Sequence, residues 1–82
     1  MTEDIQFAFI GEIACESFID FARHRAARLD LSLEMGACDA GRATMRVTGQ
    51  EALVDMFEMA CSLGPSDCII RDVTRADAWN ET

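Results

Sequence analysis

The stretch around Gly11 constrains the fold more than any other, because the spacing of apolar residues changes there. Before Gly11, apolar side chains alternate along residues 5–10, which predicts a strand that ends at the glycine. After it, apolar side chains recur every three or four positions, which predicts an amphipathic helix over residues 15–29. Glu16 near the start of that helix and Arg28 near its end match the helix dipole. The chain therefore begins with a strand, a tight crossing and a helix.

Four further elements follow from similarly local signals. The turn residues 38–41 separate two alternating stretches, which predicts a β-hairpin in which Gly41 is free to adopt positive φ. Gly49 precedes a second helical pattern, and the pair Gly64-Pro65 ends it. The predicted elements are strands over residues 31–35, 42–48 and 69–74 and a helix over residues 53–63.

The predicted order of elements is β-α-β-β-α-β, which is the order of ferredoxin-like α+β sandwiches. In this architecture two helices cover one face of an antiparallel sheet. We expect a single domain over residues 1–82, with a core over about 4–74 and a polar tail over 75–82 in which Trp79 is the one anchor. The opposite face of the sheet is predicted to be open and mostly polar. It carries Gln6, Ala8, Ser32, Glu34, Arg42, Thr44 and Arg46.

The charge balance excludes one class of partner. Fifteen acidic residues against seven basic ones give a formal net charge of −8, so a nucleic-acid backbone is repelled on average. The sequence has neither a run of about 18 apolar residues nor an apolar leader, so we expect no membrane partner and a cytoplasmic location.

The four cysteines are Cys15, Cys38, Cys61 and Cys68, and they lie far apart in the sequence. No Cys-x-x-Cys pair is present, which argues against a zinc site. We therefore expect free thiols, no metal and no cofactor.

Several glycines share the spacing of one enzyme family. Gly11, Phe18, Gly41 and Gly49 fall in its register without a gap, and the segment 63–73 is similar to its link into the fourth strand. Over residues 5–74 the chain thus resembles the acylphosphatases, small ferredoxin-like enzymes that hydrolyse carboxyl-phosphate anhydrides. Each of these residues alone is a weak signal, but three glycines and a phenylalanine in register with the same element order make a good match.

The resemblance implies that activity needs an arginine directly after the phenylalanine and an asparagine at the end of the second strand. Ile19 and Ala37 occupy those two positions, so both catalytic groups are missing. Cys15 stands where the family has a loop glycine, and two carboxylates flank the loop. The result is a degenerate anion loop that consists of Glu12, Ile13, Ala14, Cys15, Glu16, Ser17 and Phe18.

The family pattern also has a fifth strand at the sheet edge, for which the polar tail is a poor candidate. Its loss leaves an unpaired edge, which we expect at residues 31–35. Such an edge predicts a protein partner or a homodimer formed by edge pairing.

Other side chains admit two interpretations each. Asp20 and His24, four residues apart, could act as a general base with its orienting carboxylate or as part of a metal site. The favoured interpretation is a solvated carboxylate-imidazole pair on a helix face. Cys15 is either a thiolate nucleophile or an inert thiol, and again the second is favoured. Arg42 and Arg46 either bind an acidic ligand or, as favoured, pair across the strands with Glu34.

Methionines at four positions are assigned to the core or its margins rather than to a binding groove. They are Met35, Met45, Met56 and Met59.

The function predicted first is a non-catalytic binding or regulatory module that acts through a sheet edge or its acidic surface. Two alternatives stay open. One is a hydrolase of acyl phosphates that uses residues other than those of the family, and the other is a small-ligand sensor, by analogy of fold.

Overall fold

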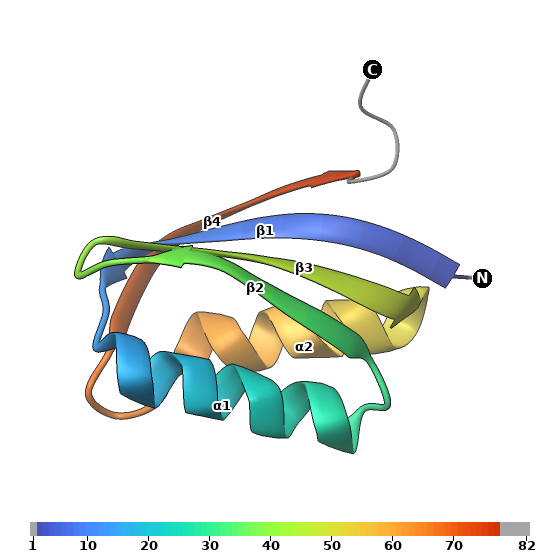
Figure 1. The fold of residues 1–82 in the computed structure, drawn as a ribbon, viewed down its shortest axis with the longest axis horizontal. Coiled ribbons are helices and arrows are strands. Elements are labelled where there is room, and N and C mark those ends of the chain that lie inside the picture. Colours follow the sequence, from blue (N-terminus) through green and yellow to red (C-terminus); the bar gives the residue numbers. More distant parts are fainter. Residues whose placement is uncertain (1, 78–82) are drawn as a thin grey trace.

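The structure is a computed structural model that describes residues 2–77. Its elements follow the predicted order β-α-β-β-α-β (Figure 1). The elements are β1 (Thr2–Glu12), α1 (Cys15–Arg28), β2 (Ser32–Cys38), β3 (Arg42–Gln50), α2 (Glu51–Leu63) and β4 (Ile69–Asp77). The α+β, ferredoxin-like prediction is confirmed.

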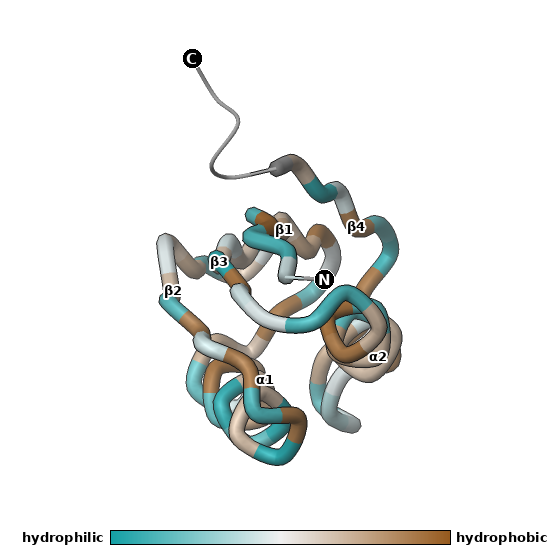
Figure 2. The backbone as a smooth tube through the Cα atoms, turned by 90° about the vertical axis from the view of Figure 1, so that its right-hand side faces the viewer, coloured by the Kyte–Doolittle hydropathy of each residue, from teal (hydrophilic) through white to brown (hydrophobic). Residues whose placement is uncertain are grey.

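The strands form one antiparallel sheet in the order β2-β3-β1-β4. Both helices lie on the same face of this sheet, and the other face is uncovered (Figures 1 and 2). Within residues 2–77 the two edges are therefore β2 and β4. The predicted edge at the second strand is confirmed, and the strand itself begins one residue later than expected, at Ser32.

The core lies between the sheet and the two helices. Alternate residues of β1 point toward the helices, so Ile5, Phe7 and Phe9 are at most 3% exposed. From the helix side, α1 contributes Phe18 and α2 contributes Phe57, both fully buried. Burial of a phenylalanine is worth about 1.5–3 kcal/mol, so these rings account for much of what holds the two layers together.

Gly11 does not end the first strand, which continues to Glu12. The register between β1 and β4 shifts next to Gly11, where β4 passes unusually close. A Cβ at this position would overlap the carbonyl oxygen of Ile69, which is a backbone atom that cannot rotate away. Gly11 is thus required by the approach of another strand rather than by a turn of its own.

The hairpin turn is built differently from the prediction. Gly41 does not have positive φ; instead the Asp39 carboxylate accepts hydrogen bonds from the backbone N–H groups of Gly41 at 2.8 Å and Arg42 at 2.9 Å. Gly49 precedes the second helix as predicted, but it lies inside β3, which continues to Gln50. The glycine that does adopt positive φ is Gly64, at 65°, and it ends α2 as predicted.

The fourth strand is longer than predicted, because it continues through residues 75–77 along β1. Trp79, the predicted anchor of the tail, lies outside the described residues. Two methionines also depart from the prediction. Met45 is buried and Met35 packs against the core, but Met56 and Met59 are 54% and 69% exposed.

Candidate functional site

The crossing from β1 to α1 consists of only Ile13 and Ala14, and both of their backbone N–H groups already donate hydrogen bonds within the protein. The N–H of Ile13 donates to the carbonyl oxygen of Ala40 at 2.8 Å, and that of Ala14 to Sγ of Cys68 at 3.4 Å. An anion that entered this crossing would have to replace both contacts.

A disulfide joins Cys15, the first residue of α1, to Cys38, the last residue of β2, with 6.1 Å between their Cα atoms. The expectation of free thiols is wrong for this pair, and with it the alternative of a Cys15 thiolate. Cys61 and Cys68 are free and buried, as expected. The pairing has no local signal because 23 residues separate the two cysteines and only the packing of α1 beside β2 brings them together.

The two positions at which the resemblance implies catalytic groups, Ile19 and Ala37, carry no polar side chain. Ile19 is half-buried on α1, one turn after the disulfide. Ala37 is exposed on β2, and its N–H donates to Oγ1 of Thr44 at 2.9 Å. Neither side chain can hold a phosphate or orient a water molecule.

The first turn of α1 faces an acidic hollow of about 520 Å³. The side chain of Ser17 is turned to Asp67, with 2.8 Å from its Oγ to Oδ1. Arg71 of β4 forms an exposed ion pair with Glu12 at 2.9 Å. The hollow is lined by Ala14, Glu16, Ser17, Asp20 and Asp67, so three carboxylates oppose the positive end of the helix. Of the predicted loop residues, Ala14, Glu16 and Ser17 line this hollow, whose carboxylates disfavour anions, whereas Ile13 and Phe18 are buried in the core.

Asp20 and His24 form the solvated pair that was favoured. His24 Nδ1 lies 3.0 Å from the carbonyl oxygen of Asp20 and 3.6 Å from Oδ2, and both side chains are about three-quarters exposed. No group of three or more metal-ligating side chains occurs within residues 2–77.

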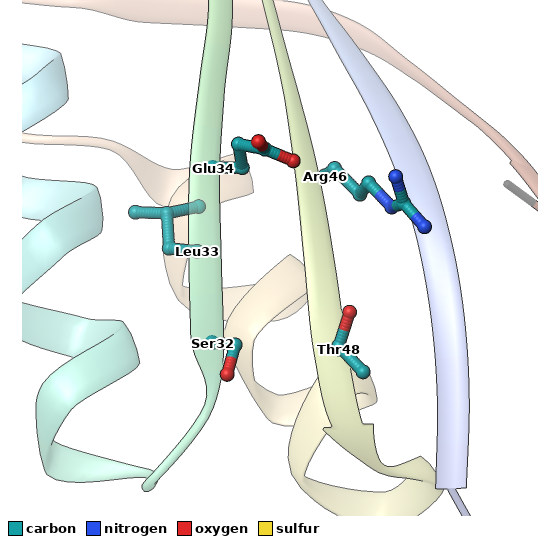
Figure 3. A pocket seen from close by; sticks show the side chains of 5 residues that line it. All are labelled: Ser32, Leu33, Glu34, Arg46 and Thr48. Carbon is teal, nitrogen blue, oxygen red and sulfur yellow. The ribbon is translucent and has the colours of Figure 1, made fainter.

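Arg46 on the open face pairs with Asp4 of β1 rather than with the predicted Glu34. Its Nε and Nη2 donate to the two carboxylate oxygens at 2.8 and 2.6 Å, and Thr48 adds a longer contact of 3.3 Å. The hydrogen bond from Arg46 lowers the pKa of Asp4, and the bond to Asp4 raises the pKa of Arg46. Glu34 lies opposite Arg46 in the register, but the guanidinium turns toward β1 (Figure 3).

Next to this pair the open face has a shallow hollow of about 330 Å³. In Figure 3 Glu34 points toward β3, whereas Leu33 points away toward α1. The hollow is lined by Ser32, Leu33, Glu34, Arg46 and Thr48. Its polar groups suit a small hydrogen-bonding ligand.

The two pairs of candidate site residues lie on opposite sides of the sheet. Arg42 and Arg46 lie on the open face of the sheet, while Asp20 and His24 belong to α1 on the other side. Arg42 is exposed at the start of β3, and its side chain has no ion pair within the part of the chain described here.

Sequence reasoning missed Arg75, because the fourth strand was expected to end before it. Arg75 contacts Asp55 and Glu58 of α2, and its guanidinium carbon lies 5.2 Å from the ring centroid of Phe7. Burial alone lowers the pKa of Arg75, but the hydrogen bonds to Glu58 and Asp55 outweigh it and the net shift is upward. The residue fastens β4 to α2.

Within residues 2–77, neither helix combines the length and apolar character that crossing a membrane requires.

Comparison with known proteins identifies solved structures of similar fold but no sequence family. No protein-family model matches the sequence, and no curated protein matches it significantly. The acylphosphatase of Bacillus subtilis superimposes with a TM-score of 0.84 at 19% identity, over 95% of this chain and 86% of that chain. The acylphosphatase of Coxiella burnetii gives 0.83 at 16% identity, over 93% and 80%.

Full-length HypF, solved in a phosphate- and nucleotide-bound form, also matches, with a TM-score of 0.83 at 18% identity. The match covers 95% of this chain but 10% of that chain. At identities of 16–19% these likenesses establish an acylphosphatase-like fold and nothing finer.

Proposed function

We propose that this acylphosphatase-like domain is a non-catalytic binding or regulatory module that acts through the edge strand β2, its acidic surface, or both. The observation that supports this proposal is the structure of the crossing from β1 to α1. A disulfide occupies the positions next to where the resemblance implies a phosphate, and no cationic side chain stands at Ile19.

Electrostatics support the loss of phosphate chemistry. Glu16, Asp20 and Asp67 line the hollow at the first turn of α1. A carboxylate about 5 Å from a phosphate is repelled by several kcal/mol at an effective dielectric of about 20. A helix terminus contributes only about 0.3–1 kcal/mol in the favourable direction, so repulsion exceeds attraction.

Hydrolysis of benzoyl phosphate tests the proposal directly. We expect no release of phosphate above a heat-inactivated control, because both the charge-stabilising and the water-orienting groups are missing. Release above that control would overturn the proposal and reinstate the alternative of a hydrolase that uses other residues. A triple variant, Cys15→Gly with Ile19→Arg and Ala37→Asn, should gain binding of inorganic phosphate if the register is correct.

The edge of β2 supports a second copy of the chain as the first partner to test. Within residues 2–77 no strand pairs with its outer side, so its backbone groups are open to another strand. In a symmetric antiparallel pair centred on Met35, Glu34 lies opposite Gly36, and no like charges face each other.

Analytical ultracentrifugation at high micromolar concentration separates the outcomes. A dimer is expected, and Ala37→Lys on the edge should shift it toward monomer, whereas Ala27→Lys on the exposed side of α1 should not. Both positions are exposed, so neither variant disturbs the core. A monomer at this concentration contradicts edge pairing.

The hollow on the open face supports the small-ligand alternative. It offers the polar atoms of Ser32, Glu34 and Thr48 beside an ion pair. A thermal-shift screen tests this, because a ligand that binds only the folded state raises the melting temperature by mass action. Phosphate and a nucleotide belong in the screen because HypF was solved with both. The variant Thr48→Val should abolish any shift that arises in this hollow.

A cytoplasmic location remains a prediction, and the disulfide weighs against it. Disulfides persist in oxidising compartments and are rare in the cytosol, where Cys15 and Cys38 would be held as thiols. Alkylation of intact cells followed by mass spectrometry of the Cys15 peptide distinguishes the two states.

A further inference from the structure

An apolar stripe runs along the solvent side of α2, beside the exposed acidic residues Glu51 and Asp55. Ala52, Met56, Met59 and Leu63 are all exposed, with exposed fractions of 54%, 69% and 80% for the last three. We call these four residues the α2 stripe. It lies opposite the face of α2 that buries Val54, Phe57 and Cys61, so it contributes nothing to the domain core.

The other helix shows what an ordinary solvent face looks like in this protein. On α1 the exposed positions carry Glu16, Asp20 and several arginines, and its trace alternates between polar and apolar colours in Figure 2, whereas α2 is mostly apolar. The solvent side of a surface helix normally carries polar or charged residues rather than an apolar stripe. The α2 stripe is therefore a surface suited to a partner.

The spacing within the α2 stripe indicates the shape of that partner. Successive members are four, three and four residues apart, which is the spacing of the apolar seam in helix-to-helix packing. A small side chain, Ala52, stands at one end and a large one, Leu63, at the other. A second helix laid along α2 would contact all four residues at once.

The charge along one flank of the α2 stripe indicates which sign of charge the partner carries there. A hollow of about 370 Å³ beside Met59 is lined by Asp55, Glu58, Met59 and Ser62. Arg75 pairs with both carboxylates, at 3.0 Å for Asp55, so two negative charges share one positive charge. One negative charge remains there, on a chain whose net charge is −8. A cationic side chain would be attracted to this flank.

A second copy of the chain is the weaker candidate for this surface. A second copy would bring the same excess of negative charge on the flank formed by Asp55 and Glu58, so it offers no charge complementarity there. A partner with its own basic residues gains electrostatic attraction in addition to the apolar contact.

We propose that the α2 stripe binds an amphipathic helix of another protein, with apolar residues at the same four-three-four spacing and a lysine or arginine facing Asp55 and Glu58. This goes beyond the module proposed above, because it names a surface away from β2 and the chemistry of its ligand. It does not depend on whether the chain is catalytic.

The test uses three synthetic helical peptides and the full chain. The first peptide has leucines at four-three-four spacing and lysines on one flank, the second replaces those lysines with glutamates, and the third scrambles the leucines. Binding is measured by fluorescence anisotropy, and the contact surface is mapped from amide chemical shifts of the ¹⁵N-labelled chain. We expect binding of the lysine peptide only, with shifts centred on the α2 stripe and affinity that falls with added salt.

Two variants separate the apolar and charge contributions. Met59→Gln should weaken binding of the lysine peptide by about tenfold or more, since it removes an apolar contact at the centre of the stripe. Asp55→Asn should weaken it and reduce its salt dependence. Ile69→Gln is the matched control, because Ile69 is also exposed (52%) but lies outside α2, and it should have no effect.

Three results would overturn the proposal. They are an absence of binding by the lysine peptide, equal binding by the glutamate peptide, and self-association of the chain that Met59→Gln abolishes. The last result would assign the stripe to a second copy. Circular dichroism of each variant verifies that the fold is retained.

Discussion

Breaking the disulfide between Cys15 and Cys38 should destabilise the domain strongly. The bond closes a loop in which the two cysteines are 23 residues apart, so in the unfolded chain it removes conformational freedom that the reduced chain keeps. The chain-entropy relation gives about 3 kcal/mol at 25 °C for a loop of this length. For a domain of this size, that corresponds to a fall in melting temperature of roughly 12–24 °C.

Urea denaturation followed by circular dichroism, with and without a phosphine reductant, measures the effect. The midpoint should fall on reduction, and the slope m should rise because the reduced unfolded chain exposes more surface. The double variant Cys15→Ala with Cys38→Ala should match the reduced wild type and should not respond to reductant. This control shows that the buried Cys61 and Cys68 take no part in the effect.

A specific result would refute the reasoning. If oxidised and reduced protein unfold at the same urea concentration, the bond does not restrict the unfolded chain as argued. If untreated protein unfolded in denaturant has four titratable thiols instead of two, the bond itself is absent.

Three further predictions concern other parts of the fold. Gly11→Ala should lower the free energy of unfolding by about 1–3 kcal/mol in urea denaturation, because the added Cβ overlaps the Ile69 backbone; an unchanged midpoint would contradict this. Asp4→Asn should lower stability at neutral pH but not near pH 2: Arg46 depresses the pKa of Asp4 in the folded state, so this stabilisation is present above the ordinary value of 3.8 and is lost as pH falls through the lower folded value. A gap between wild type and variant that persisted in acid would refute that assignment. Burial raises the pKa of Cys61 to about 12, so its thiol should not react with Ellman's reagent at pH 8 until the protein is unfolded, and rapid labelling of the native chain would show that this part of the core is open.

The sequence was sufficient to predict the order of the elements and most of the core. Alternation along β1 and the three-to-four spacing of α1 are local properties, because side chains two residues apart share a strand face and those three or four apart share a helix face. These spacings predict that Phe7, Phe9 and Phe18 lie in the core, and all three are fully buried. The resemblance assigned Ile19 and Ala37 to the family's catalytic positions, and that assignment stays a prediction.

Contacts between elements could be identified only from the tertiary structure. The disulfide required α1 to lie against the end of β2, and the pairing of Arg46 with Asp4 required the guanidinium to turn toward β1 rather than toward Glu34. The apolar spacing of α2 predicted a helix, but it did not reveal that Met56 and Met59 would lie outside the core. Periodicity assigns side chains to faces of one element, whereas register and packing between elements decide which of those faces meet and which remain exposed.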